Sequence, residues 1–172
     1  MSQSNREMPP VLRRLNRMEF DYADGEGIDF EPFAEFLSVD DTTSWIRAWT
    51  GNEHLDGNDY LVFGQDGSGG YAALWLARKN TPLAAQPVVF FGSEGELGVI
   101  ARDLSDFLWL LASNLGPYEA LTYPEAERIA NTALAQFAAA HAASPQRSPS
   151  EILSLARDAF PEFESDIQST IR

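Results

Sequence analysis

The chain has 172 residues, of which 44% are hydrophobic and 12% aromatic, so it can bury a sizeable core and global disorder is not expected. Its formal net charge of −14 argues against nucleic acid or an anionic membrane as a partner, because both are polyanions. Such a surface suits a basic protein partner, since long-range attraction speeds their encounter, although many proteins are acidic for solubility alone.

The chain has no cysteine, which excludes a disulfide scaffold, a thiol nucleophile and every zinc site that needs Cys ligands. Residues 1–20 lack the continuous apolar core of a signal peptide, and no apolar run approaches the length of a membrane span. We therefore expect a cytoplasmic protein.

Residues 1–20 are expected to form a polar tail followed by a short helix. After Pro9-Pro10, four apolar residues have the spacing of one helix face: Val11, Leu12, Leu15 and Met18. The arginines between them are too few, on so acidic a chain, to bind a polyanion, so we expect a docking helix.

Residues 21–117 are expected to form one α+β domain. A first helix would open at Asp29, after an acidic, glycine-containing loop. One face of this helix would carry Phe33, Phe36 and Leu37.

A second helix would run from Asp41 or Thr42 through Trp49 and end at Gly51. Trp45 and Trp49 lie one helical turn apart, which suits packing on a sheet. Because Trp buries a large area, such a pair is more often part of a core than a ligand platform.

Apolar runs rich in β-branched and aromatic residues predict a small, mainly antiparallel sheet of about four strands in two successive hairpins. The runs are 60–63, 71–76, 87–91 and 97–101. Glycine-rich turns at 64–70 and 92–96 would join them.

A helix is expected after the sheet, with Asp103 as its N-cap and Gly116-Pro117 as its end. Its apolar residues follow the spacing of one helix face: Leu104, Phe107, Leu108 and Leu111. This segment would close the α+β domain.

Residues 118–172 are expected to add C-terminal helices that pack on the same domain. The alanine-rich stretch Pro124–Ala143 predicts one long helix. A capping box from Ser148 to Glu151 predicts the next, and Pro161 would start a short last helix.

The glycine-rich stretch 64–70 has two interpretations, a hairpin turn and a phosphate-binding loop. No lysine follows the glycines, and the next run, which contains Trp75, predicts a strand rather than a helix. Asp66 would also repel a phosphate. The turn is therefore the favoured interpretation.

No catalytic or metal site is predicted, and we expect no cofactor. The two histidines, His54 and His141, lie in different expected elements, and the acidic residues near His54 lack the length and closing glutamate of an EF-hand loop. A nucleophile elbow requires a helix directly after its serine, and no helix is expected after Ser68. We expect a protein that is not an enzyme.

Taken in order, these residues resemble the SUKH superfamily, which includes the SMI/KNR-like regulators. The resemblance covers about residues 28–115 and leaves the chain from Tyr118 onward outside it. It rests on Trp45, Trp49, residues 63–70, Trp75, residues 87–96 and residues 99–108.

The resemblance implies an α+β fold without enzymatic activity. Bacterial members are immunity proteins that bind and neutralise a cognate toxin, often a nuclease, so the partner would be a protein, for example a basic toxin domain. Fungal relatives act as interaction hubs, and a general scaffold or regulatory protein is therefore the alternative function.

Three acidic residues at the tips of the glycine-rich turns are the expected partner contacts: Asp66, Glu94 and Glu96. We expect all three to be exposed. Contacts on the helical faces are the competing hypothesis, and the sequence leaves the oligomeric state open.

Overall fold

The computed structural model describes residues 6–172 and contains a five-stranded antiparallel sheet in the order β1-β2-β3-β4-β5. The strands are β1 (Glu31–Pro32), β2 (Tyr60–Gln65), β3 (Tyr71–Trp75), β4 (Val88–Phe91) and β5 (Leu97–Ala101). The helices are α1 (Pro10–Leu15), α2 (Val39–Thr50), α3 (Leu104–Ala112), α4 (Pro117–Thr122), α5 (Thr132–His141), α6 (Pro149–Ala159) and α7 (Phe163–Thr170). The predicted α+β fold is confirmed, with five strands rather than four.

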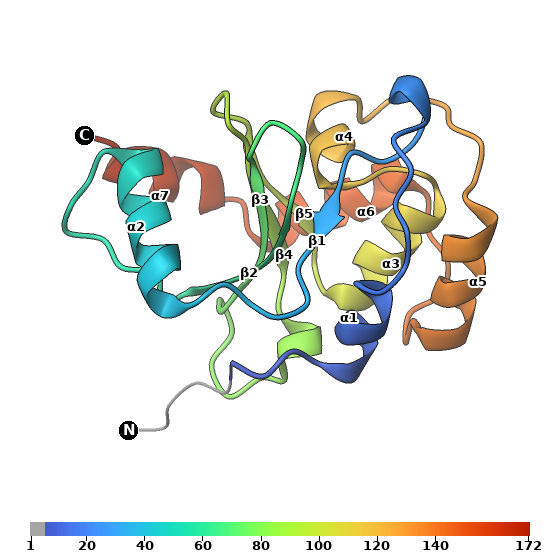
Figure 1. The fold of residues 1–172 in the computed structure, drawn as a ribbon, viewed down its shortest axis with the longest axis horizontal. Coiled ribbons are helices and arrows are strands. Elements are labelled where there is room, and N and C mark those ends of the chain that lie inside the picture. The colour runs from blue at the N-terminus through green and yellow to red at the C-terminus, as the bar shows by residue number, and fades with distance from the viewer. Residues whose placement is uncertain (1–5) are drawn as a thin grey trace.

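Helices cover both faces of the sheet (Figure 1). Helices α2 and α7 lie on one face, and α1 and α3 lie on the other, with α5 packed on the outer side of α3. Helix α6 packs along β5 and so covers that edge of the sheet. At the opposite edge, β1 is two residues long and contains Pro32, which has no backbone N–H to offer another strand.

Two hydrophobic clusters explain why the strands are continuous apolar runs in the sequence. Side chains alternate between the faces of a strand, so Leu61 and Phe63 join α1 and α3 in one cluster. Tyr60 and Val62 join α2 and α7 in the other. An antiparallel sheet usually leaves one face in water, whereas here both faces are buried.

Phe91 is the centre of the cluster beneath α2 and is fully buried. Its ring makes edge contacts with Trp45 at 5.0 Å, Trp49 at 5.1 Å and Tyr60 at 5.3 Å between ring centroids. Trp49 also donates its indole N–H to the carbonyl of Gly92 over 2.8 Å. The prediction that the two tryptophans pack on the sheet is confirmed.

The helix predicted to open at Asp29 and carry Phe33, Phe36 and Leu37 is wrong, because this segment is extended. Glu31 and Pro32 pair with the end of β2. Beyond them, the Phe33 N–H donates to the Phe63 carbonyl over 2.9 Å, and the Leu37 N–H donates to the Val62 carbonyl over 3.0 Å. Hydrogen bonds to a neighbouring strand replace those that a helix would have made.

The long helix predicted for Pro124–Ala143 is also wrong in its first half. Helix α5 begins at Thr132, where Asn131 accepts the Leu134 N–H over 3.0 Å as the N-cap. The Asn131 N–H is itself bound to the Ala112 carbonyl over 3.0 Å, which anchors the chain on α3 before the helix starts. Pro117, expected to end a helix, instead occupies the first position of α4.

The other predicted helices are present. Helix α2 ends at Gly51, which has a φ of 68°, and Ser38 caps its N-terminus. Asp103 caps α3 by accepting the Asp106 N–H over 2.9 Å. Ser148 caps α6 by accepting the Glu151 N–H over 3.3 Å, and a last helix follows Pro161.

The aromatic cluster predicts a large effect of one core substitution. Phe91→Ala should lower the free energy of unfolding by about 4 kcal/mol, because it removes a fully buried ring and leaves a cavity. Ile129→Ala, at a side chain that is 89% exposed, should change it by less than about 0.5 kcal/mol. Urea unfolding of both variants measures this; a loss below about 1 kcal/mol for Phe91→Ala would contradict the packing described.

Candidate functional site

Residues 6–172 contain no helix long and apolar enough to cross a membrane. In the same part of the chain, no three His, Asp or Glu side chains are grouped so that they could hold a metal ion. The two histidines lie in separate parts of the fold: His54 follows α2 and is exposed, while His141 ends α5 and lies 4.4 Å from the Phe137 ring between centroids.

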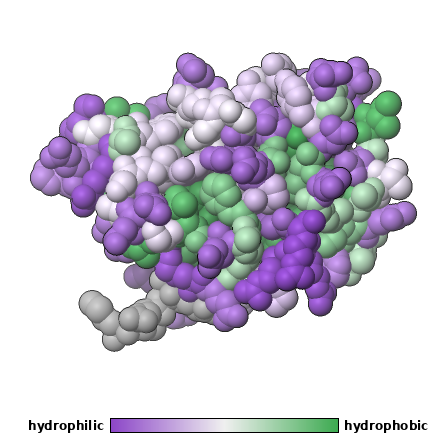
Figure 2. Space-filling model, in the orientation of Figure 1, coloured by the Kyte–Doolittle hydropathy of each residue, from purple (hydrophilic) through white to green (hydrophobic). Residues whose placement is uncertain are grey.

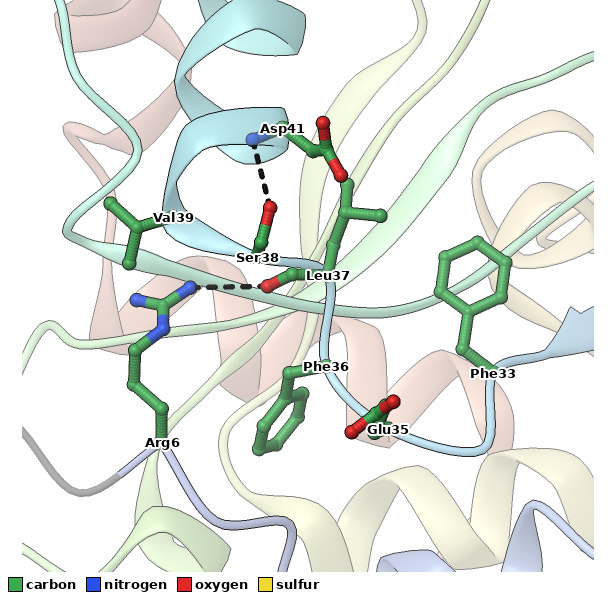
Figure 3. A pocket seen from close by; sticks show the side chains of 8 residues that line it. All are labelled: Arg6, Phe33, Glu35, Phe36, Leu37, Ser38, Val39 and Asp41. Carbon is green, nitrogen blue, oxygen red and sulfur yellow. Dashed lines mark hydrogen bonds between the residues drawn. The ribbon is translucent and has the colours of Figure 1, made fainter.

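A hollow of about 640 Å³ lies beside the segment between β1 and α2 (Figure 3). Arg6 reaches across it and donates to the carbonyls of Leu37 over 3.5 Å and Tyr60 over 3.2 Å, and burial lowers the pKa of its guanidinium. The carboxylates of Glu35 and Asp41 also line the hollow. Because its one cation is bound to carbonyls beside two anions, this hollow is poorly suited to an anionic ligand.

Asp66 is 3% exposed, so the prediction that its side chain is exposed is wrong. Its Oδ1 accepts three hydrogen bonds, from the Ser68 N–H at 3.0 Å, the Ser68 hydroxyl at 2.8 Å and the Gly70 N–H at 2.8 Å. Gly69 between them has a φ of 94°, which a side chain would strain. Asp66 therefore holds the β2–β3 turn together from inside it.

Of the two glutamates of the β4–β5 turn, Glu94 is exposed as predicted, whereas the prediction that Glu96 is exposed is wrong. Glu94 is exposed at the tip, and Glu96 is half-buried at its base. One carboxylate oxygen of Glu96 accepts the Glu94 N–H over 3.2 Å. The β2–β3 turn lies beside this one, since Tyr71 and Phe91 are paired across β3 and β4.

Asp29 connects the turns to two further segments. Its Oδ1 accepts the Gly67 N–H over 2.8 Å, and its own N–H donates to the Glu119 carboxylate over 2.5 Å. Helix α4, which carries Glu119, packs against β5. The loop before β1, both turns and the chain around α4 therefore form one continuous region.

This region, which we call the acidic end, comprises residues 21–29, 66–70, 92–96 and 116–131. It holds ten of the 26 acidic residues of the chain but one of its 12 basic residues. The acidic residues are Asp21, Asp24, Glu26, Asp29, Asp66, Glu94, Glu96, Glu119, Glu125 and Glu127. The ion pairs among residues 6–172 lie outside the acidic end, at Glu7 and Asp106.

Arg128, the basic residue of the acidic end, is turned toward the backbone. Its guanidinium donates to the carbonyls of Gly25 over 3.2 Å and Asn114 over 3.3 Å, and also to that of Gly27. The charge presented to solvent there is consequently that of the carboxylates, and six of these are exposed: Asp21, Asp24, Glu26, Glu94, Glu125 and Glu127.

Glu119 differs from these carboxylates because it is 3% exposed. Burial raises its pKa, and the hydrogen bond from the Asp29 N–H opposes that rise in part. Its second carboxylate oxygen has no hydrogen-bond partner among residues 6–172. An ionised Glu119 is therefore costly to the fold.

Sequence reasoning identified the Glu94 and Glu96 turn but not the loops of residues 21–29 and 123–131 as one surface with it. The sequence does contain one indication of this surface: the large hydrophobic residues Tyr22, Tyr123 and Ile129 stand among acidic and small residues. Figure 2 shows hydrophobic atoms protruding at the right-hand rim, where Figure 1 places the chain between α4 and α5.

Comparison of the chain with models of protein families, with curated proteins and with solved structures finds no match. The resemblance to the SUKH superfamily stays a prediction from the residues. The acidic end is the feature of the structure on which a function can be argued.

The turn at Asp66 predicts a graded series of stabilities. Asp66→Ala should lower the free energy of unfolding by about 2–3 kcal/mol, because it removes the acceptor of three hydrogen bonds. Ser68→Ala removes one of them and should cost about 1 kcal/mol, whereas Glu94→Ala should cost less than about 0.5 kcal/mol. Chemical denaturation tests the order; equal stabilities of Asp66→Ala and Glu94→Ala would contradict it.

Burial of Glu119 predicts a dependence of stability on pH. Because its pKa is raised in the folded state, the stability that its proton contributes is complete below the unfolded value of about 4.3 and is lost as the pH rises through the folded value. Glu119→Gln keeps an acceptor for the Asp29 N–H and does not ionise. Its stability relative to the parent protein should therefore increase between about pH 4 and pH 7. A difference that stays constant or shrinks would refute this.

Proposed function

We propose that this protein is a non-catalytic binding module that neutralises a cognate toxin by direct contact, with the acidic end as its binding surface. The observation that carries this proposal is the concentration of ten acidic residues in that region, six of them exposed, around an arginine that is bound to backbone carbonyls. The resemblance to the SUKH superfamily supports the same class of function.

Electrostatics favours a basic protein as the partner. Unpaired carboxylates gathered on one surface repel one another, and a cationic partner relieves this repulsion while long-range attraction raises the rate of encounter. A nuclease domain, whose surface must attract a polyanion, has the complementary charge. Blocking that surface would stop the nuclease without any chemistry on the part of this protein.

Glu94 and Glu96 contribute to this surface from the β4–β5 turn. Glu94 stands exposed at the tip, and Glu96 supports the turn by accepting the Glu94 N–H. We assign contact with the partner to Glu94 and Glu96, and assign Asp66 to the internal structure of the neighbouring turn.

Co-expression with the toxin encoded beside this protein's gene tests the proposal. The protein should restore growth, bind the purified toxin, and associate more slowly as salt is added. Glu94→Lys/Glu96→Lys should lower the association rate about tenfold at low salt. The matched charge change on α6, Glu151→Lys/Asp158→Lys, should leave the rate within about twofold, because both residues lie outside the acidic end.

Failure to restore growth would contradict the proposal. Stable association with several unrelated housekeeping proteins, and with no toxin, would instead favour a general scaffold or regulatory protein. Equal association rates for the turn variant and the α6 variant would remove the β4–β5 turn from the binding surface.

A further inference from the structure

Two loops of the acidic end, residues 21–27 and 123–131, form a surface of their own, which we call the double loop. The Arg128 guanidinium joins them by donating to the Gly25 carbonyl over 3.2 Å, and the Asn114 amide donates to the Glu26 carbonyl over 3.0 Å. A hollow of about 610 Å³ lies between them, with Ala126, Ala130 and Ile129 in its lining.

Large hydrophobic side chains are exposed on the double loop. Tyr22 is 57% exposed, Tyr123 is 52% exposed and Ile129 is 89% exposed. The other exposed large hydrophobic residue among residues 6–172 is Ile171, close to the C-terminal end of the chain. One exposed hydrophobic residue is ordinary, but three on one pair of joined loops are typical of an interaction surface.

The same two loops carry exposed carboxylates. Five are exposed on the double loop: Asp21, Asp24, Glu26, Glu125 and Glu127. Arg128, the basic residue there, directs its guanidinium at backbone carbonyls. The surface therefore combines apolar side chains with negative charge. It is complementary to a segment that is apolar and cationic.

The backbone of the double loop is held in an uncommon conformation. Within it, Ala23 and Asp24 have φ angles of 48° and 52°, and Asn114, which contacts it from the segment between α3 and α4, has a φ of 63°. A left-handed conformation at such residues persists when surrounding contacts fix it, and Arg128 and the Asn114 side chain supply these contacts. The surface is thus formed before any partner arrives, which lowers the entropic cost of binding.

We propose that the double loop docks a protein segment in which an apolar side chain is flanked by lysine or arginine. This inference rests on the proposed function and assigns the apolar part of its interface. Charge complementarity selects the occupant: a second copy of this chain would bring like charges together, since each copy carries −14.

A synthetic peptide tests the inference without knowledge of the partner. The probe has a central Leu-Phe pair flanked by lysines, and its control replaces that pair by Gly-Ser and keeps the lysines. In a titration of the full-length, ¹⁵N-labelled protein at low salt, the probe should shift amide signals of residues 21–27 and 123–131 to saturation. The control should bind about tenfold more weakly, because the apolar contact is missing.

Substitutions identify the anchor. Ile129→Ser should weaken binding of the probe about tenfold, whereas Ile171→Ser should leave it within about twofold. In the parent protein, added salt should weaken binding of the probe. Glu125→Lys/Glu127→Lys should abolish this salt dependence, and Glu151→Lys/Asp158→Lys should leave it in place. Because Ile129 is 89% exposed, its replacement does not threaten the fold.

Three results would overturn the inference: equal binding of probe and control, shifts that are spread over all acidic surfaces, or binding that is insensitive to Ile129→Ser. These outcomes are independent of the rescue experiment. Docking of the probe without rescue of growth would overturn the proposed function alone, and rescue that tolerates Ile129→Ser would overturn the double loop alone.

Discussion

Burial of the sheet on both faces determines where the helices of this protein pack. Each of the strands β2, β3 and β4 sends alternate side chains into two hydrophobic clusters, so neither face can remain in water. Helices α2 and α7 satisfy one face, and α1 and α3 the other. Because helices cover both faces and α6 covers the β5 edge, the hairpin turns are the parts of the sheet that a partner can reach at the acidic end.

Acidic residues divide into two groups by what surrounds them. Asp106 is fully buried and is held by Arg102 at 3.1 Å and Arg147 at 3.2 Å, which fixes the chain after α5 onto α3. Asp66 is held by hydrogen bonds within its turn, and Glu119 by the Asp29 N–H. These carboxylates serve the fold, while those exposed on the loops, of which Asp21 accepts the Ala23 N–H over 2.9 Å, contribute to the negative field of the acidic end.

Much of the fold was accessible from the sequence because its signals are local. Apolar runs between glycine-rich turns identified β2 to β5, and capping residues such as Asp103 and Ser148 identified helix starts. Strand β1 was missed because its two residues are too few to show a periodicity. They form a strand only by pairing with β2, which lies far away in the sequence.

The errors in the candidate site have a similar origin. Asp66 lies in a turn that is polar in sequence, and only the three-dimensional turn shows that its carboxylate points inward. Alanine-rich composition favoured a helix from Pro124, yet Arg128 donates to the Gly25 carbonyl and the chain before Thr132 is a turn followed by irregular structure. Hydrogen bonds between residues about a hundred positions apart hold the double loop together and connect the segments of the acidic end. No local sequence pattern predicts such contacts.

Hydrogen–deuterium exchange of the full chain, alone and mixed with the toxin that we propose as its partner, is the sharpest test of the role of the acidic end. We expect slower exchange on binding at residues 21–27, 92–96 and 123–131, with α2 and α7 unchanged. Protection confined to α2 and α7, with exchange at those loops unaltered, would contradict the assignment of the acidic end as the binding surface.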